Sequence, residues 1–326
     1  MKSNELLFFE PVFKKKVWGG TKLNQQFHYA VSGDNIGECW GISAHQEGAA
    51  KVKNGRYKGW TLRELWANER GLFAPVDRDE FPLLVKIIDA SDALSVQVHP
   101  DDESAMEMEG YPYGKTECWY ILDAETDSKL IYGHRAKTKN ELQELVASGN
   151  WDDLFQEVPV EAGDFVHVPS GTVHAIGAGI VLLEIQQSSD ITYRFYDYDR
   201  PGTDGELRPL HIDESIACTR VPDPVSAESI VKTGKQDSSV SVLVEDPYFH
   251  VHKLNPGKLD GELSFSNPSF LLMTVTEGAG YVRTNSDEHT EIAKGDHFIV
   301  PAGIETLHIC GDCTIISAYV PPEANQ

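Results

Sequence analysis

One segment of sixteen residues occurs twice in the chain, and it limits the possible folds more than any other feature. The copies are AGDFVHVPSGTVHAIG at 162–177 and KGDHFIVPAGIETLHI at 294–309. Each reads Gly-Asp, an apolar run and Pro-x-Gly, followed after two residues by a position that differs, His174 in one copy and Thr306 in the other. Repeats this far apart in the chain favour two related domains over a solenoid, in which repeats follow one another directly.

Segments typical of β-structure occur along the whole chain. They are short, rich in Val, Ile, Leu and aromatic residues, and bounded by Gly, Pro, Asn and Asp, at 83–89, 93–99, 117–122, 164–169, 180–186, 270–276 and 297–301. Helical patterns occur at 61–70 and at 138–149, where Thr138 and Glu141 have capping-box spacing and Gly149 ends the pattern. We therefore predict an all-β fold of two barrels with a few peripheral helices.

The length and the distribution of polar residues predict where the chain divides. A chain of 326 residues is long enough for two domains that each bury a core. Residues 219–240 are polar, contain two prolines and show little periodicity, which indicates a linker. We predict a first domain over 1–235 and a smaller second domain over 236–326.

The charge and the cysteines exclude several classes of function. The formal net charge of −23 opposes binding to phosphate backbones and anionic lipid, so neither nucleic acid nor membrane is expected as a partner. The N-terminal residues fit neither a signal peptide nor a membrane span, which favours the cytoplasm. The five cysteines have no framework spacing and are expected to be reduced, and nothing implies an obligatory protein partner.

Three polar residues on one predicted strand suggest a site. Ser95, Gln97 and His99 alternate in LSVQVHP, so their side chains leave a strand by the same face. Polar groups on an interior face need partners. Lys115 and Glu117 have the same spacing at the start of the next apolar run.

His174 adds a second imidazole at the mouth of a further strand. Imidazole, carboxylate and carboxamide groups are suitable ligands for zinc or a similar divalent ion. The alternative is that Gln97, His99 and His174 are hydrogen-bonded polar residues inside a barrel. The spacings leave both interpretations open.

The second copy of the repeat lacks such ligands, whereas the first resembles a known motif. Gly163, Pro169, Gly171 and His174 match the second conserved motif of the cupin superfamily, Gly-x5-Pro-x-Gly-x2-His. The resemblance implies two cupin-type jelly-roll barrels, a bicupin. His174 would then be a metal ligand in the first barrel only.

The first cupin motif, usually His-x-His followed by Glu, is altered in this chain. Gln97 occupies the first histidine position and His99 the second. Glu103 has the shorter spacing for the acidic member, and Glu117 has the strand context. We choose Glu117, because Glu103 follows a proline and is expected on a helix that faces solvent.

With these altered motifs, the chain resembles the short bacterial form of the type I mannose-6-phosphate isomerase family. The resemblance covers essentially the whole chain and rests on the motifs FKKKVWGG, IGECWGISAH, SVQVHPDD, GKTECWYIL and ITYRFYDYDR. One departure is Gly41, where the family usually has Glu.

The resemblance implies a zinc-dependent aldose–ketose isomerase that interconverts mannose 6-phosphate and fructose 6-phosphate through an enediol(ate). It implies one Zn²⁺ per chain, held by His99, Glu117 and His174 with Gln97 as a fourth ligand. Glu117 would be the only anionic ligand, so the site would keep about one positive charge beside the developing oxyanion.

The resemblance also implies roles for residues around the metal. Arg194 matches the family's active-site arginine, a fixed cation beside the reacting oxygens or the phosphate. Lys115 is expected either to contact the phosphate or to move the proton between C1 and C2. Ser95 is expected either to donate to the phosphate or to bond to backbone. Aromatic residues that would line the pocket, or else belong to the core, are Trp18, Tyr193, Phe195 and Tyr196.

Three alternatives remain. A cupin-type glucose-6-phosphate isomerase would use a different sugar phosphate, and an iron dioxygenase of this fold would usually keep the histidine that Gln97 replaces. A non-catalytic sugar-binding cupin would catalyse no reaction, so removing metal would cause no loss of activity.

Overall fold

The computed structural model describes residues 5–31, 33–76, 78–202, 204–233, 238–258, 262–266, 269–284 and 289–321. Its helices are α1 (Lys22–Phe27), α2 (Leu62–Asn68), η1 (Arg70–Leu72), α3 (Asp102–Glu109), α4 (Lys139–Ser148), α5 (Trp151–Leu154), α6 (Ile212–Cys218), η2 (Ala227–Ser229) and η4 (Pro256–Lys258). Its strands are β1 (Leu7–Glu10), β2 (Val12–Gly20), β3 (Ile36–Ile42), β4 (Lys51–Val52), β5 (Leu83–Ala90), β6 (Val96–Val98), β7 (Glu117–Ala124), β8 (Lys129–His134), β9 (Phe155–Pro159), β10 (Asp164–Val168), β11 (His174–Ile176), β12 (Ile180–Gln187), β13 (Tyr193–Tyr196), β14 (Val231–Lys232), β15 (Val240–Glu245), β16 (His250–Leu254), β17 (Glu262–Ser266), β18 (Leu271–Arg283), β19 (His289–Ala293), β20 (His297–Val300) and β21 (Thr306–Tyr319). The predicted all-β body with few helices is confirmed.

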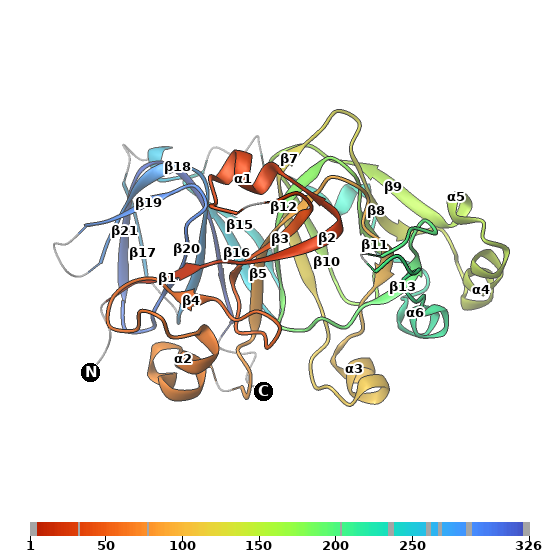
Figure 1. The fold of residues 1–326 in the computed structure, drawn as a ribbon, viewed down its shortest axis with the longest axis horizontal. Coiled ribbons are helices and arrows are strands. Elements are labelled where there is room, and N and C mark those ends of the chain that lie inside the picture. The colour runs from red at the N-terminus through yellow and green to blue at the C-terminus, as the bar shows by residue number, and fades with distance from the viewer. Residues whose placement is uncertain are drawn as a thin grey trace.

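In the described ranges these strands form three sheets (Figure 1). The first part of the chain supplies a seven-stranded sheet, in the order β14-β10-β7-β12-β5-β2-β3, and a five-stranded sheet, in the order β13-β6-β11-β8-β9. A nine-stranded sheet contains β15 to β21 together with β1 and β4. In Figure 1 this sheet lies at the opposite end of the molecule from α4, α5 and α6.

Separate apolar clusters hold these layers together. Trp119 of the seven-stranded sheet and Tyr132 of the five-stranded sheet belong to one buried cluster, so the two sheets face each other. Phe195, on the outer side of the five-stranded sheet, packs with Leu142 of α4. Burying a side chain of this size stabilises the fold by about 1.5–3 kcal/mol. The α4 helix therefore covers the outer face of the five-stranded sheet. The inner face of that sheet is left for the site.

A third cluster joins the two parts of the chain. It contains Ile87 and Ile185 from the outer face of the seven-stranded sheet and Ile299 and Ile316 from the nine-stranded sheet. Strand β1 pairs with β20, although it belongs to the first ten residues. The division at residue 235 stays a prediction, and contacts across it are extensive.

The Gly-Asp turn of the repeated segment has the same backbone conformation in both copies. Gly163 and Gly295 each have a φ of 92°, a conformation that favours glycine. The carboxylates of Asp164 and Asp296 each accept a hydrogen bond, at 2.9 Å, from the backbone N–H three residues earlier. The Gly-Asp pair therefore specifies one turn, used once in each part of the molecule.

The predicted helices are present. Thr61 and Glu64 form a capping box at the start of α2. Thr138 caps α4, but Glu141 accepts from the N–H of Lys137 and not from that of Thr138, so half of the predicted capping box forms. None of the helices in the described ranges has the length and apolar composition that crossing a membrane requires.

Gly41 lies against a buried histidine of the second repeat copy. A Cβ atom at position 41 would come within 2.3 Å of His297 Nδ1, so no side chain fits there. His297 is fully buried, Tyr29 Oη lies 2.9 Å from its Nε2, and Thr274 Oγ1 lies 2.9 Å from its Nδ1. The departure at Gly41 therefore has a packing explanation.

His297 should make the stability of the fold depend on pH. Burial lowers its pKa from about 6.5 to about 4. Below pH 6.5 the unfolded chain takes up a proton on this imidazole, and the folded chain does not until about pH 4, so stability present above pH 6.5 is lost as the pH falls. We expect the unfolding free energy at pH 5 to be about 2 kcal/mol lower than at pH 7.5 from this residue alone. Urea unfolding of wild type and His297→Phe at both pH values would measure the difference, and equal pH dependence in the two proteins would contradict it.

Candidate active site

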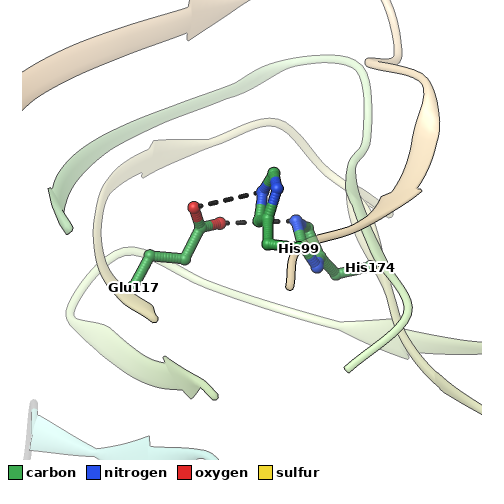
Figure 2. A group of neighbouring side chains, drawn as sticks. All are labelled: His99, Glu117 and His174. Atoms are coloured by element: carbon green, nitrogen blue, oxygen red, sulfur yellow. Dashed lines mark ion pairs between the residues drawn. The ribbon is translucent and has the colours of Figure 1, made fainter. Parts of the chain in front are cut away.

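Strands of two facing sheets bring the predicted ligands together (Figure 2). In the five-stranded sheet β6 lies between β11 and β13, and Gln97 is paired with His174 on one side and Arg194 on the other. His99 follows β6 directly. Glu117 begins β7 in the opposite sheet, and its carboxylate points at both imidazoles.

The Pro-x-Gly turn fixes the position of His174 relative to His99. The N–H of Gly171 donates to the carbonyl of His99 at 2.8 Å. Gly171 has a φ of 79°, and a Cβ there would meet Arg220 Cγ at 2.9 Å. Glycine is therefore required at this corner, which delivers the start of β11 next to β6.

The imidazoles present their Nε2 atoms to the carboxylate. His99 Nε2 lies 3.4 Å from Glu117 Oε2, and His174 Nε2 lies 3.4 Å from Glu117 Oε1. Their Nδ1 atoms lie 2.8 Å from the carbonyl of Ile191 and 2.9 Å from that of Thr172, respectively. A carbonyl only accepts, so each Nδ1 carries the proton and each neutral ring keeps a lone pair on Nε2.

Burial favours this neutral form. It lowers the pKa of His99 well below the ordinary histidine value, and it lowers that of His174 to about 4, with the charge of Lys115 acting in the same direction. Both rings are therefore neutral at pH 7, which is the form that binds a metal ion.

The arrangement fits a divalent cation. The ligand atoms of His99, Glu117 and His174 all lie within 4.8 Å of one another, and all three side chains are buried. Glu117 Oε1 is buried and has no hydrogen-bond partner in the described part of the chain. A carboxylate oxygen facing an imidazole lone pair is repulsive without a cation between them. Two nitrogens and a carboxylate are a donor set that zinc accepts.

Gln97 and Lys115 border this cluster. The amide Nε2 of Gln97 is 3.5 Å from His99 Nε2 and 3.4 Å from His174 Nε2, and a half-turn of the amide would place its oxygen there. Lys115 Nζ is 2.8 Å from His99 Nε2 and also contacts Glu117 Oε2. A buried ammonium group therefore lies directly beside the candidate ligands.

A cavity of about 360 Å³ opens next to the cluster. Its lining includes every predicted non-histidine site residue: Ser95, Gln97, Lys115, Glu117 and Arg194. The hydroxyl of Ser95 donates to Gln97 Oε1 at 3.2 Å. A larger cavity, of about 640 Å³, lies beside α2 and contains none of these residues, so the chemistry favours the smaller one.

Sequence reasoning missed several charged residues of this cavity, among them a buried ion pair. Lys86 and Glu184 are paired in register on β5 and β12, and Lys86 Nζ lies 2.8 Å from Glu184 Oε1. Each is the one charged residue inside an apolar strand core, LLVKII and IVLLEI, and a buried charge requires a partner. A charged residue inside an apolar run was therefore the signal in the sequence that could have indicated this ion pair.

The predicted aromatic residues have different places. Trp18 lines the cavity. Tyr193 and Phe195 are buried on the opposite face of the five-stranded sheet, and Tyr196 stacks on Trp151 at 5.3 Å between ring centroids. Of the two places expected for these aromatics, the pocket holds for Trp18 and the core for the three on β13, because alternation sends Tyr193 and Phe195 to the face opposite Arg194.

Comparisons with known proteins give a consistent result. A family model described as phosphomannose isomerase type I, catalytic domain, matches residues 6–113, and one described as mannose-6-phosphate isomerase, cupin domain, matches residues 239–320. Mannose-6-phosphate isomerase ManA of Bacillus subtilis is 47% identical, over 98% of this chain and 100% of that protein. Mannose-6-phosphate isomerase of Streptococcus mutans is 45% identical, over 97% of this chain and 98% of that protein.

Solved structures agree with these matches. A crystal structure of the mannose 6-phosphate isomerase from Bacillus subtilis superimposes with a TM-score of 0.88 at 42% identity, covering 96% of this chain and 99% of that one. A structure titled as mannose 6-phosphate isomerase bound with zinc and yttrium has a TM-score of 0.76 at 16% identity, covering 96% of this chain and 99% of that one. At that identity the likeness shows the fold alone.

Proposed function

The chain belongs to the type I mannose-6-phosphate isomerase family, and on that premise we propose that it interconverts D-mannose 6-phosphate and D-fructose 6-phosphate with one Zn²⁺ per chain. The observation that carries the proposal is the buried His99–Glu117–His174 cluster. Glu117 Oε1 lacks a hydrogen-bond partner among the described residues, and the cluster borders a cavity lined in part by lysine and arginine side chains.

We propose His99, Glu117 and His174 as the metal ligands and Gln97 as the fourth. A bound divalent ion would polarise the substrate carbonyl and stabilise the negative charge of an enediol(ate). The donor set of two imidazole nitrogens and a carboxylate supports zinc as the ion. One carboxylate and three neutral ligands would leave about one formal positive charge at the site.

Lys115 is the proposed proton carrier. Conversion of the aldose to the ketose moves one proton from C2 to C1 and one from the C2 hydroxyl to the C1 oxygen. Lys115 lines the cavity and its Nζ lies against Glu117 and His99, so it is at the reacting end of the cavity. As an amine it can accept the proton from C2, and as an ammonium group it can return it to C1. This position favours proton transfer over phosphate contact.

Arg194 and Ser95 are proposed to bind the substrate. Arg194 lies across β6 from His174, and burial lowers the pKa of its guanidinium. A buried arginine is a fixed cation, suited to the phosphate or to the oxygens of the sugar. When the Gln97 oxygen is turned toward the metal, the Gln97 amide nitrogen faces Ser95 Oγ, so the Ser95 hydroxyl accepts from it and keeps its proton to donate to the substrate.

The remaining assignments follow from the substrate and the charge. We propose that the enzyme acts in the cytoplasm on a small sugar phosphate, without nucleic acid, membrane or obligatory protein partner. The formal charge of −23 supports this, because it disfavours anionic polymers and lipid surfaces. The division into a catalytic domain over 1–235 and a second cupin domain over 236–326 is proposed with it.

An assay with two substrates tests the function. We expect the purified protein, supplied with zinc, to form fructose 6-phosphate from mannose 6-phosphate at a kcat of roughly 1–1,000 s⁻¹. Glucose 6-phosphate, which differs only at C2, should react at least 100-fold more slowly. Equal rates would favour the glucose-6-phosphate class, and no turnover of either sugar would favour a binding protein.

A further inference from the structure

The segment that carries Lys115 to the site has no regular structure of its own. Residues 111–116, which the structure describes throughout, lie between α3 and β7 and belong to no helix or strand. Residues 114–116 are buried, and so is Glu117, which follows them. Buried backbone N–H groups outside a helix or strand need other acceptors. The groups that accept from this segment therefore decide how it presents Lys115 and Glu117.

Neighbouring parts of the chain supply these acceptors. Three consecutive N–H groups donate to them: Gly114 to Asp102 Oδ1 at 2.7 Å, Lys115 to the Pro100 carbonyl at 2.9 Å and Thr116 to Gln187 Oε1 at 2.8 Å. Two of the acceptors are side chains, that of Asp102 at the start of α3 and that of Gln187 at the end of β12. A hydrogen bond to a charged acceptor such as Asp102 contributes about 1.5–3 kcal/mol. The two side chains therefore hold the segment on one path.

Gln187 bonds to both backbone groups of Thr116. Its side-chain oxygen accepts from the Thr116 N–H, and its own backbone N–H donates to the Thr116 carbonyl at 3.0 Å. Its amide Nε2 donates to Asp102 Oδ1 at 3.0 Å, which joins the two side chains to each other. Thr116 stands between Lys115 and Glu117 in the chain, so fixing its backbone fixes the start of both side chains.

Both side chains act from outside the cavity. Neither Asp102 nor Gln187 is among the described residues that line it, whereas Gln186 is. Side chains alternate along a strand, so β12 directs Gln186 into the cavity and Gln187 toward α3. Asp102 and Gln187 can therefore influence the reaction only through the residues that they hold.

The turn between β15 and β16 brings Tyr248 to the same place. Phe249 is fully buried in a cluster that also contains Cys118, and Tyr248 packs against that cluster. The turn is fixed by Asp246, whose N–H donates to the Phe249 carbonyl at 3.0 Å and whose Oδ1 accepts from the Tyr248 N–H at 2.9 Å. Burial, then the charge of Asp102 and a hydrogen bond to it, raises the pKa of Tyr248 to about 12. Tyr248 is therefore a neutral hydrogen-bond donor beside Asp102 at pH 7.

We propose that Asp102 and Gln187 are positioning residues that fix the backbone of Thr116, and through it the site side chains on either side, and that Tyr248 in turn fixes Asp102. The second part of the molecule supplies none of the proposed ligands, and this contact gives it a role in the geometry of the site. The inference rests on the proposed function where it concerns proton transfer, and on the metal cluster alone where it concerns the carboxylate ligand.

The test compares wild type with four variants: Asp102→Ala, Asp102→Asn, Tyr248→Phe and Glu103→Ala. Loss of the partner that orients a ligand should lower kcat in Asp102→Ala by roughly 10- to 100-fold and weaken zinc binding to the metal-free protein about tenfold, with KM within about threefold. Asparagine should recover most of both losses, because its amide oxygen can accept the same two hydrogen bonds. Tyr248→Phe should lie between wild type and Asp102→Ala.

Glu103→Ala is the matched control. Glu103 is an exposed acidic residue of the first turn of the same helix, so its replacement changes the net charge equally. We expect kcat and zinc affinity within about threefold of wild type, because Glu103 holds no part of the segment. Gln187→Leu should resemble Asp102→Ala, and the half-buried Asp102 and Tyr248 decide the test if this fully buried substitution prevents folding.

Zinc affinity and thermal unfolding separate the possible outcomes. If Asp102→Ala lowers Tm but keeps the kcat and zinc affinity of Glu103→Ala, Asp102 only stabilises the fold and the proposal is overturned. Equal losses in Asp102→Asn and Asp102→Ala would overturn the hydrogen-bond assignment, and wild-type values in Tyr248→Phe would overturn the link to the second part of the molecule. If wild type is inactive but zinc binding weakens in Asp102→Ala and not in Glu103→Ala, the isomerase proposal fails and the positioning of Glu117 stands.

Discussion

Replacing His174 by alanine should lower kcat/KM for mannose 6-phosphate by about a thousandfold or more and leave the fold intact. The reason is the loss of a cation worth several kcal/mol to the developing oxyanion. The variant would keep one imidazole and Glu117, a set too small to hold the ion at ordinary zinc concentrations. Steady-state kinetics measures the loss, and circular dichroism with thermal unfolding checks the fold. His99→Ala should behave in the same way.

His167→Ala is the matched control for this prediction. His167 lies on β10, seven residues before His174 in the same motif, but it is 28% exposed and its Nε2 lies 3.1 Å from Asp246. The alanine variant should keep kcat/KM within threefold of wild type. A His174→Ala protein that turned over mannose 6-phosphate at the wild-type rate would show that His174 is not a ligand of the working metal.

Replacing Lys115 by methionine should reduce kcat by about 10²- to 10⁴-fold, the range expected when an acid–base residue is lost. Methionine has a similar length and no proton to transfer. Bound zinc should be retained, because Lys115 is not one of the proposed ligands. The KM should change only a few fold, because Lys115 is assigned to the reacting carbons and not to the phosphate.

Two further variants separate the possible roles of Lys115. Lys115→Arg keeps the positive charge but cannot act as a base, so it should be nearly as slow as methionine if proton transfer is the role. Lys129→Met, at an exposed lysine of β8 that pairs with Glu157, should behave as wild type. A large rise in KM with unchanged kcat in Lys115→Met would instead assign Lys115 to the phosphate.

Much of the fold was predictable from local patterns. The strands over 83–89, 117–122, 164–169 and 180–186 all form, because their apolar runs are ended by turn residues. The predicted strand over 93–99 shortens to Val96–Val98, but its alternation still places Ser95, Gln97 and His99 on one face. The alternation of side chains along a strand is a local property, so it can be predicted without knowledge of the tertiary structure.

Pairing between distant segments was not predictable in the same way. Strand β1 joins the sheet of the second part through β20, and no residue in LFFE indicates that partner. The tie between Gly41 and His297 likewise joins residues far apart in the chain. Such contacts depend on how whole sheets stack, which a single sequence does not encode locally.

The proposed metal ligands could be predicted from the sequence, whereas Arg208 of the cavity wall could not. His99, Glu117 and His174 stand in motifs with regular spacing. Arg208 stands in a polar loop, and it reaches the cavity wall because His211 ties the end of that loop to β13 and Asp197 holds its guanidinium. Loop geometry of this kind is set by tertiary contacts, so this arginine became visible only in the folded chain.

The most direct test of the central claim is a zinc titration of metal-free protein, with bound zinc and initial rate measured on the same samples. For wild type, both quantities should rise together and level off at one zinc per chain. For His174→Ala, neither should rise over the same range of zinc concentration. Full activity of wild type without metal, or zinc-dependent activity in His174→Ala equal to that of wild type, would contradict the claim that the His99–Glu117–His174 cluster holds the catalytic ion.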